Sequence, residues 1–249
     1  MRYFITLSYD GTAYHGWQIQ PNAPSVQETL QHALSTLLRQ DVEVVGAGRT
    51  DTGVHARRMV AHFDWTEPLD GAQLAYKLNK LLPRDIAVQG VELVADDMHA
   101  RFSAVSRTYH YYLHLHKDPF LQGRSWQMYG PLDFEAMNRA AQLLLSYRDF
   151  TSFSKLHTDT KTNDCTVTEA RWDELSPGQW RFTITANRFL RNMVRAVVGT
   201  LVEVGRGRMT LEAFCRVIER KDRCQAGESV PAHGLYLVDI KYPFPMNTF

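Results

Sequence analysis

The segment SVQETLQHALSTLLRQ, residues Ser25–Gln40, is the clearest sign of regular structure in the chain, and the fold assignment starts from it. Ser25 can cap a helix, and Glu28 stands three residues further on, which completes a capping box. A strand rich in aromatic and β-branched residues, Arg2–Tyr9, precedes this helix and ends at an Asp-Gly turn. The apolar residues of the helix recur at helical spacing, at Val26, Leu30, Ala33, Leu34, Leu37 and Leu38.

The rest of the chain continues this alternation of strands and helices. The first half is predicted to have the order βαββαβ, with further elements at Val42–Val45, Met59–Trp65, Leu69–Leu82 and Ile86–Val94. The second half repeats the order without repeating the sequence, at Thr108–Leu115, Phe134–Leu145, Cys165–Trp172, Trp180–Ala186, Phe189–Val204 and Leu235–Tyr242, with one more helix at Leu211–Arg220. We therefore expect an α/β (α+β) fold of two ferredoxin-like halves, residues 1–105 and 106–249, with antiparallel sheets joined or packed side by side.

Composition excludes several classes of protein. The 249 residues are 44% hydrophobic and 22% charged, which is typical of a soluble globular protein. No apolar run approaches the ~20 residues that a membrane span needs. The three cysteines are an odd number without CxxC spacing, which favours a reducing, cytoplasmic location. The net charge of +1 speaks, taken alone, against a nucleic-acid partner.

The most informative loop is GAGRTDTGVHA, residues Gly46–Ala56. Its three glycines allow positive φ or a close approach of the backbone, and a loop at a strand end often displays functional groups. It carries one carboxylate, Asp51, and one guanidinium, Arg49. No Lys-Ser/Thr pair follows, so the segment is not a nucleotide-binding P-loop. A tight turn in which Asp51 bonds only to local backbone remains an equally good interpretation of the loop alone.

Two further features are compatible with RNA binding. Arg188, Arg191 and Arg195 have the spacing of one helical face, on a helix that is apolar elsewhere, and residues 188–208 carry a local charge of +4. A solvated helix edge would explain these arginines equally simply. Arg101-Phe102 and residues 107–112, RTYHYY, interleave basic and aromatic side chains, which suit phosphates and stacked bases, although most aromatic residues in strands belong to the core. The spacing of His110, His114 and His116 does not indicate a metal site.

At this point the sequence resembles a known family, the tRNA pseudouridine synthase A family. The matching motifs occur along the whole chain: YDGTAYHGWQIQPN (9–22), GAGRTDTGVHA (46–56), HARFSAVSRTYHYYL (99–113), RDFTSFS (148–154), FLRNMVRAVVGTLVEVGRG (189–207) and PAHGLYLVDIKY (231–242). The resemblance implies an isomerase that converts uridine to pseudouridine at positions 38, 39 and 40 of the tRNA anticodon stem-loop, without cofactor or metal. It also implies a cytoplasmic homodimer with a basic cleft for tRNA, to which both halves contribute as one catalytic unit.

The family's motifs assign roles to particular residues. The resemblance implies that Asp51 is the catalytic carboxylate and that Tyr109 binds the substrate. An ionised Asp51 can attack the sugar or the base, or act as a base, and the sequence leaves these alternatives open. We expect Arg191 to favour its charged form, with Arg195 as the alternative partner. Arg49 is expected to fill the position that a flipped nucleotide vacates or to hold its phosphate.

Two other classes of function are alternatives to this one. A non-catalytic RNA-binding protein would suit ferredoxin-like sheets with aromatic residues but gives no reason for Asp51 beside bound phosphates. A nucleoside hydrolase would share the aspartate nucleophile but would not rejoin the base. The long polar loop at Ser146–Asn163 is expected to be functional. The whole-chain charge averages a basic segment with acidic ones, so it does not exclude a basic tRNA site.

Overall fold

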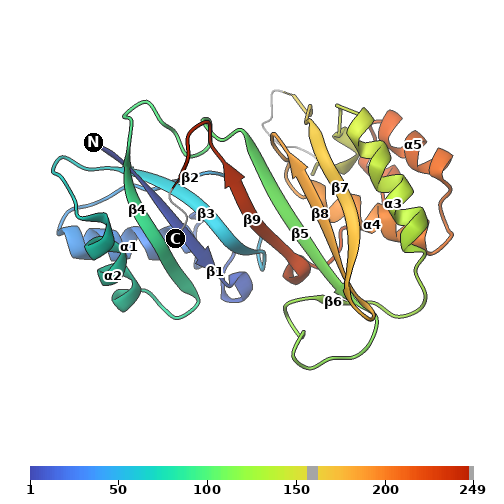
Figure 1. The fold of residues 1–249 in the computed structure, drawn as a ribbon, viewed down its shortest axis with the longest axis horizontal. Helices are drawn as coiled ribbons and strands as arrows, with labels where there is room; N and C mark the ends of the chain where they lie inside the picture. Colours follow the sequence, from blue (N-terminus) through green and yellow to red (C-terminus); the bar gives the residue numbers. More distant parts are fainter. Residues whose placement is uncertain (156–161, 247–249) are drawn as a thin grey trace. The chain divides into compact units, whose positions relative to one another are not determined.

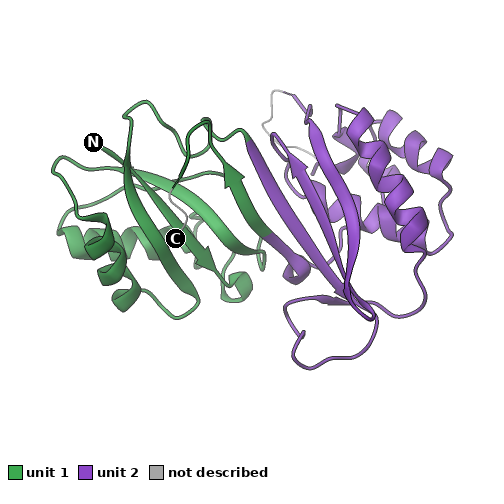
Figure 2. Ribbon diagram, in the orientation of Figure 1, with its two compact units in different colours: residues 1–105, 237–249 green, residues 106–236 purple. Residues whose placement is uncertain are grey.

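A computed structural model describes residues 1–155 and 162–246 of the chain. It divides the chain into two compact units, which Figure 2 shows in different colours: unit 1 is Met1–Val105 with Leu237–Phe249, and unit 2 is Ser106–Tyr236. The predicted boundary places all of 106–249 in one half. The grouping differs because the last strand crosses the boundary, so that its first two residues belong to unit 2 and the rest to unit 1.

Unit 1 has the predicted βαββαβ order. Its elements are β1 (Arg2–Tyr9), α1 (Val26–Leu38), β2 (Val45–Gly46), β3 (His55–Asp64), α2 (Gly71–Leu81) and β4 (Ile86–Val94), with most of β9 (Leu235–Lys241) added from the end of the chain. The strands lie in the order β4-β1-β3, with β2 and β9 next to β3, and β1 is antiparallel to both β3 and β4. This is the strand order of a ferredoxin-like sheet, so the prediction for the first half is confirmed. Figure 1 shows α1 and α2 together beside these strands.

Local signals explain most of these elements. Ser25 accepts a hydrogen bond from the backbone N–H of Glu28, which is the predicted cap of α1, and the side chain of Asp70 caps α2 in the same way. The predicted strand at Val42–Val45 is wrong for its first residues. The N–H groups of Val42 and Val44 donate instead to the side chains of Ser35 and Gln31 on α1, at 3.0 Å each, which replaces strand pairing.

Strand β1 is buried on both of its faces. Five consecutive residues, Tyr3 to Leu7, are almost inaccessible to solvent, whereas a strand that covers one face of a sheet buries every second residue. On one of the two faces, the ring of Phe4 packs against Tyr242 and Phe244, with ring centroids 5.1 and 6.0 Å apart. The C-terminal segment after β9 therefore covers part of the sheet of unit 1.

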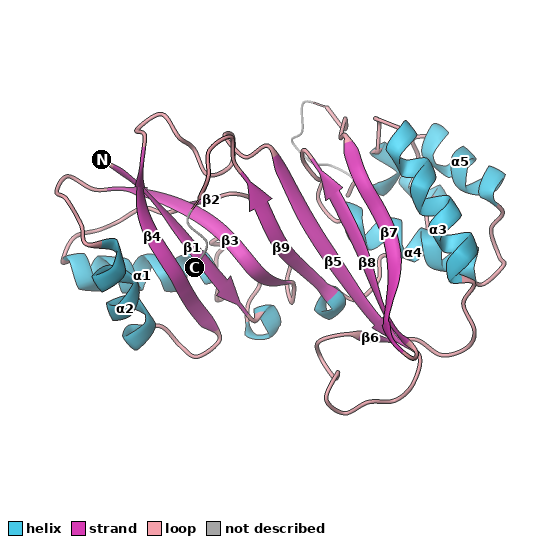
Figure 3. Cartoon of the chain, viewed as in Figure 1, coloured by secondary structure: helices cyan, strands magenta, loops and turns pink. Residues whose placement is uncertain are grey.

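The described residues of unit 2 form a mainly antiparallel sheet and three α-helices. Its elements are β5 (Ser106–His114), β6 (Trp126–Gln127), α3 (Phe134–Leu143), β7 (Val167–Ser176), β8 (Gln179–Ala186), α4 (Met193–Gly205) and α5 (Leu211–Glu219). Strand β8 lies between β5 and β7 and is antiparallel to both, and β6 pairs with β5 in parallel. Figure 3 shows α3, α4 and α5 grouped beside β7 and β8. The core helix is α4, in which eleven of 13 residues are buried.

The loop expected to be functional, Ser146–Asn163, starts at the last residue of the 3-10 turn Leu144–Ser146, and its described part includes the 3-10 turn Thr151–Phe153. Residues 156–161 of this predicted loop lie outside the described residues. Across the described part of the chain, no helix combines the length and the apolar character needed to cross a membrane.

Candidate functional site

The Asp51 loop, residues 47–54, connects β2 to β3 in unit 1. The backbone O of Asp51 accepts a hydrogen bond from the N–H of Val54 at 3.1 Å, and Gly53 has a φ of +77°, so the chain reverses within four residues. Asp51 itself is half-buried. The loop therefore holds a carboxylate at a defined place, only partly exposed to water.

A second loop, residues 10–17, packs directly against the Asp51 loop. A Cβ added to Gly11 would lie 2.0 Å from the backbone O of Val54, and one added to Gly16 would lie 2.1 Å from the O of Thr50. Gly16 also has a φ of +88°, which disfavours any other residue. Only glycine allows two backbones to come this close, so these two positions fix the separation of the loops.

Hydrogen bonds reinforce this packing. The phenol of Tyr9 and the hydroxyl of Thr50 share a buried hydrogen bond of 2.9 Å, immediately before Asp51 in the chain. The backbone O of Thr50 accepts from the N–H of Trp17 at 3.4 Å, and the O of Tyr14 accepts from the N–H of Gly53 at 3.3 Å. The backbone on both sides of Asp51 is thus bonded to the second loop.

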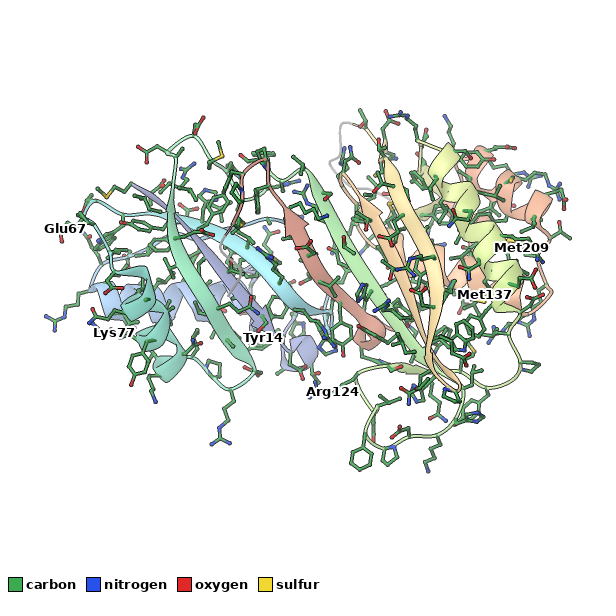
Figure 4. All side chains as sticks on the ribbon, in the orientation of Figure 1. Tyr14, Glu67, Lys77, Arg124, Met137 and Met209 are labelled. Carbon is green, nitrogen blue, oxygen red and sulfur yellow. The ribbon has the colours of Figure 1, made fainter. Side chains whose placement is uncertain are left out.

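Tyr14 anchors the second loop to the end of β4. Its phenol donates to Asp85 at 2.8 Å, and Figure 4 labels this side chain. Burial, together with the hydrogen bond to Asp85, raises the pKa of Tyr14 well above its usual value. The phenol therefore stays protonated and remains a donor at physiological pH.

His55, four residues after Asp51, ties the two loops together. Its Nδ1 accepts a hydrogen bond from the N–H of Gly11 at 3.1 Å and lies 3.1 Å from a carboxylate oxygen of Asp10. The same Asp10 oxygen accepts from the N–H of Thr12 and holds the turn at 11–13. Neither His55 nor Tyr9 was predicted to belong to the site. The available sequence signal was that both lie within the motifs at 9–22 and 46–56. Their contacts could not be predicted from it, because they join residues about 40 positions apart.

Arg49 lies two residues before Asp51 and is exposed. A Cβ on the neighbouring Gly48 would meet no atom within 4 Å, so this side of the loop opens into free space. The structure thus brings Arg49 and Asp51 onto one short loop of unit 1. The other predicted site residues, Tyr109, Arg191 and Arg195, all belong to unit 2.

Tyr109 lies on β5 opposite Ile184 of β8 and is half-buried. The ring of Phe189 meets it edge to face, with centroids 5.1 Å apart and an interplanar angle of 85°. This arrangement is favourable for two aromatic rings and fixes the plane of the tyrosine. Tyr109 is therefore held in place by side-chain packing while part of its surface stays accessible.

The predicted helix at Phe189–Val204 is wrong at its start, because α4 begins at Met193. Asn192 has a left-handed φ of +66°, and its side chain donates to the hydroxyl of Ser229 at 2.6 Å. Arg188 and Arg191 consequently precede the helix, and the expected stripe of three arginines on one face does not exist. Arg191 is exposed, and its backbone O accepts from the N–H of Lys155.

Arg195 is the single cation on α4. Its side chain is half-buried, and its Nε donates to the backbone O of Val230 at 2.7 Å. Burial raises the pKa of the nearby Tyr111, and the positive charge of Arg195 opposes that rise. The N–H groups of Arg195 that are shielded from water need hydrogen-bond acceptors, and the O of Val230 is one of them.

Part of the basic segment at 188–208 is neutralised locally. The guanidinium groups of Arg206 and Arg208 both pair with Glu203, at 3.0 and 3.7 Å.

The histidines of β5 are hydrogen-bonded to neighbouring side chains. Nδ1 of His114 bonds to Ser125, and Nδ1 of His110 bonds to the phenol of Tyr112. Within residues 1–155 and 162–246, no three His, Cys, Asp or Glu side chains are grouped so that they could hold a metal ion.

Comparison with known proteins agrees with the resemblance of the motifs. A sequence profile described as tRNA pseudouridine synthase matches residues 5–103 and 140–243, which include Asp51 and Arg195 but not Tyr109. Proteins named tRNA pseudouridine synthase A are similar over nearly the whole chain. Those of Bacteroides thetaiotaomicron and Porphyromonas gingivalis are each 60% identical, over 97% of this chain and 91% and 97% of their own lengths. That of Bacillus subtilis is 39% identical, over 97% of this chain and 99% of its own.

A chain of a solved Cbf5–Nop10–Gar1 complex is also similar, with 12% identity and a TM-score of 0.32, over 80% of this chain and 54% of that chain. A likeness of this size says nothing about function. The sequence matches, together with the fold, define the protein as an isomerase of the pseudouridine synthase class. The chain belongs to the tRNA pseudouridine synthase family, whose members convert uridine to pseudouridine in tRNA.

Proposed function

We propose that this chain isomerises uridine at positions 38, 39 and 40 of the tRNA anticodon stem-loop, with Asp51 as the nucleophile. The observation that carries the proposal is that the loop at residues 10–17 packs against the Asp51 loop and holds its backbone in place. Two glycines and several hydrogen bonds fix the backbone around a half-buried carboxylate. Such preorganisation is what a reaction at one defined carbon or ring atom requires.

The reaction changes the uracil atom through which the base is attached to the ribose. The bond between N1 and C1′ breaks, the base turns over, and a bond between C5 and C1′ forms. C5 loses a proton and N1 gains one, so that atoms and electrons balance without an oxidant or reductant. Attack by the Asp51 carboxylate on the sugar or the base divides this change into two easier steps.

Tyr109 is proposed to stack on the target base, and its phenol to remove the C5 proton in the last step. The edge-to-face contact with Phe189 supports this role, because it fixes the ring plane before the substrate binds. Arg195 is proposed as the partner that keeps Asp51 charged. It replaces Arg191 as the favoured partner because Arg195 lies on a rigid, buried helix and Arg191 does not.

Arg49 is proposed to occupy the space of the extruded uridine or to hold its phosphate. Extrusion of a base from a paired stem costs a few kcal/mol, and a cation on the same short loop as Asp51 offsets part of that cost. We expect Arg49→Ala to slow turnover of folded tRNA with little effect on the free energy of unfolding, since Arg49 is exposed. An unchanged rate on full-length tRNA would remove this role.

The resemblance of the motifs also supports a homodimer in the cytoplasm, with tRNA as the macromolecular partner and no resident cofactor. Sedimentation velocity of the purified chain, with and without tRNA, tests the dimer. A monomer at micromolar concentration would contradict it.

The central experiment is tritium release from tRNA labelled at C5 of uracil. A pseudouridine synthase releases tritium and retains the base, a nucleoside hydrolase frees uracil, and an RNA-binding protein does neither. We expect Asp51→Asn to abolish tritium release while tRNA binding is nearly unchanged. Persistent release by this variant would overturn the role of Asp51.

A further inference from the structure

The turn at residues 98–103 of unit 1 is closed by its own hydrogen bonds. Nδ1 of His99 accepts from the backbone N–H groups of Arg101 and Phe102, at 3.1 and 3.3 Å. The hydroxyl of Ser103 accepts from the N–H of His99, and the N–H of Ser103 donates back to the O of His99, both at 2.9 Å. Four hydrogen bonds within a few residues give this segment one backbone conformation.

The turn is also anchored to the sheet of unit 1 through its central residue. Ala100 is fully buried, its N–H donates to Nδ1 of His62 on β3 at 3.2 Å, and its O accepts from the phenol of Tyr242 at 2.6 Å. A guanidinium N–H of Arg2 donates to the O of Met98. The turn is therefore fixed at its beginning and at its middle.

The two residues after this anchor point away from the core. Phe102 is 76% exposed, although isolated exposed apolar side chains are common and need no explanation. Phe102 differs from such residues because two neighbouring side chains contact its ring and restrict its orientation. The ring of His99 lies 4.4 Å from it, and the guanidinium carbon of Arg101 lies 5.5 Å from its centroid. An exposed aromatic ring and a cation over that ring are thus presented together on a rigid support.

We propose that the Arg101–Phe102 turn is a contact site for an unpaired nucleotide of the tRNA, separate from the loop that carries Asp51. The aromatic face of Phe102 stacks on the base, and the guanidinium of Arg101 pairs with the phosphate beside it. An unpaired nucleotide is specified because a base within a stem already stacks on its neighbours. The inference rests on tRNA as the substrate of the proposed function and adds a second place of attachment.

The test measures tRNA affinity, separately from chemistry. Filter binding of unmodified tRNA should give a Kd for Phe102→Ala that is roughly five- to hundredfold weaker, the range for loss of one stacked base. Turnover at saturating tRNA should be unchanged. Phe102→Trp should bind within about twofold of the original chain, and Phe102→Leu should resemble Phe102→Ala, because leucine is apolar but has no π-face.

A matched control is present on α2, where Tyr76 is 64% exposed and Nζ of Lys80 lies 5.4 Å from its ring. This pair has similar chemistry on a plain helix surface, so Tyr76→Ala should leave the Kd within about twofold. Arg101→Gln should weaken binding and reduce the slope of log K against log salt by about one, as expected for one phosphate contact. Urea midpoints should be unchanged in all of these variants, which verifies that they fold.

An unchanged Kd for Phe102→Ala, full binding by Phe102→Leu, or an equal loss of affinity in Tyr76→Ala would each overturn the inference. So would a Phe102→Ala variant whose sedimentation coefficient shifts while its Kd stays unchanged. That last result would assign Phe102 to a contact between two copies of the chain. The proposed function fails separately, if the original chain binds tRNA but releases no tritium.

Discussion

The phenol oxygen of Tyr9 and the hydroxyl oxygen of Thr50 lie 2.9 Å apart, buried, at the residue that precedes Asp51. The two residues are 41 positions apart in the chain, one at the end of β1 and one in the loop between β2 and β3. The bond fixes the backbone from which the Asp51 side chain extends. If Asp51 is the nucleophile, as proposed, we expect Tyr9 to be a positioning residue that acts through the backbone of Asp51.

Tyr9→Phe removes only this hydroxyl, and we expect it to lower kcat by roughly ten- to a hundredfold with little change in KM, because a small displacement of a reacting group costs rate more than binding. Thr50→Val should have the same effect, and Thr50→Ser, which keeps the hydroxyl, should restore most of the rate. Tritium release at varied tRNA concentration measures both constants. If Thr50→Ser were as slow as Thr50→Val, the methyl group and not the hydrogen bond would be responsible.

The close approach of the two loops predicts that alanine substitutions at Gly16 and Gly48 have very different effects on the free energy of unfolding. Gly16→Ala places a Cβ 2.1 Å from a backbone oxygen at a φ of +88° and should lower the free energy of unfolding by roughly 2–5 kcal/mol. Gly48→Ala, on the same pair of loops but in open space, should change it by less than about 0.5 kcal/mol. Urea denaturation measures both. Equal effects would show that the loops separate in solution.

Because α4 starts at Met193, Arg195 lies on the helix and Arg191 precedes it, and we expect substitutions of these two arginines to have unequal effects on kcat. If Arg195 keeps Asp51 charged, as proposed, Arg195→Met should lower kcat by at least about tenfold with nearly normal tRNA binding, because it removes that half-buried cation. Arg191→Met removes an exposed cation and should change kcat by less than about threefold. Single-turnover tritium release compares them directly. The reverse order of effects would restore Arg191 as the partner of Asp51.

His62 predicts an acid-sensitive stability of unit 1. Burial, and to a lesser degree the charge of Arg2 and the neighbouring His99, lower the pKa of His62 from 6.5 to about 4. Below pH 6.5 the unfolded chain binds a proton that the folded chain excludes, so the free energy of unfolding falls as the pH falls toward 4. Between pH 7.5 and 5 this loss amounts to about 2 kcal/mol.

His62→Gln keeps an acceptor for the N–H of Ala100 but does not titrate, so its unfolding free energy should fall by about 2 kcal/mol less over the same range. Urea denaturation at the two pH values tests this. Parallel pH dependences for both proteins would assign the acid sensitivity to other groups.

Elements with local signals were predicted to within a few residues. β1 and β4 have the predicted bounds, and the cap of α1 is the predicted Ser25, because these features depend on neighbouring residues. The start of α4 was missed because it depends on a bond from Asn192 to Ser229, 37 residues away. The short strand β6, Trp126–Gln127, has too little sequence pattern to be predicted.

The candidate site shows the same limit. The glycine-rich pattern at 46–56 indicated a functional loop and its carboxylate. The pattern did not reveal that Gly11 and Gly16 pack on this loop or that Tyr9 and His55 tie it to a second loop. Such contacts depend on how β1 and β3 pair, from Arg2 opposite Asp64 to Tyr9 opposite Ala56, and local sequence patterns do not show this register. The roles of Asp51, Arg49, Arg191 and Arg195 stay predictions for the experiments above, and the role of Tyr109 stays a prediction.

The assignment of Leu237 and the residues after it to unit 1 has a consequence for synthesis on the ribosome. Residues 106–236 are contiguous and can fold as they emerge, whereas residues 1–105 wait on the order of ten seconds for the segment that completes them. In that interval part of one edge of β3 lacks β9, and Ala100 lacks the phenol of Tyr242. An open strand edge in a nascent chain invites mispairing. The unit that carries Asp51 is thus begun before unit 2 and completed after it during synthesis of this chain.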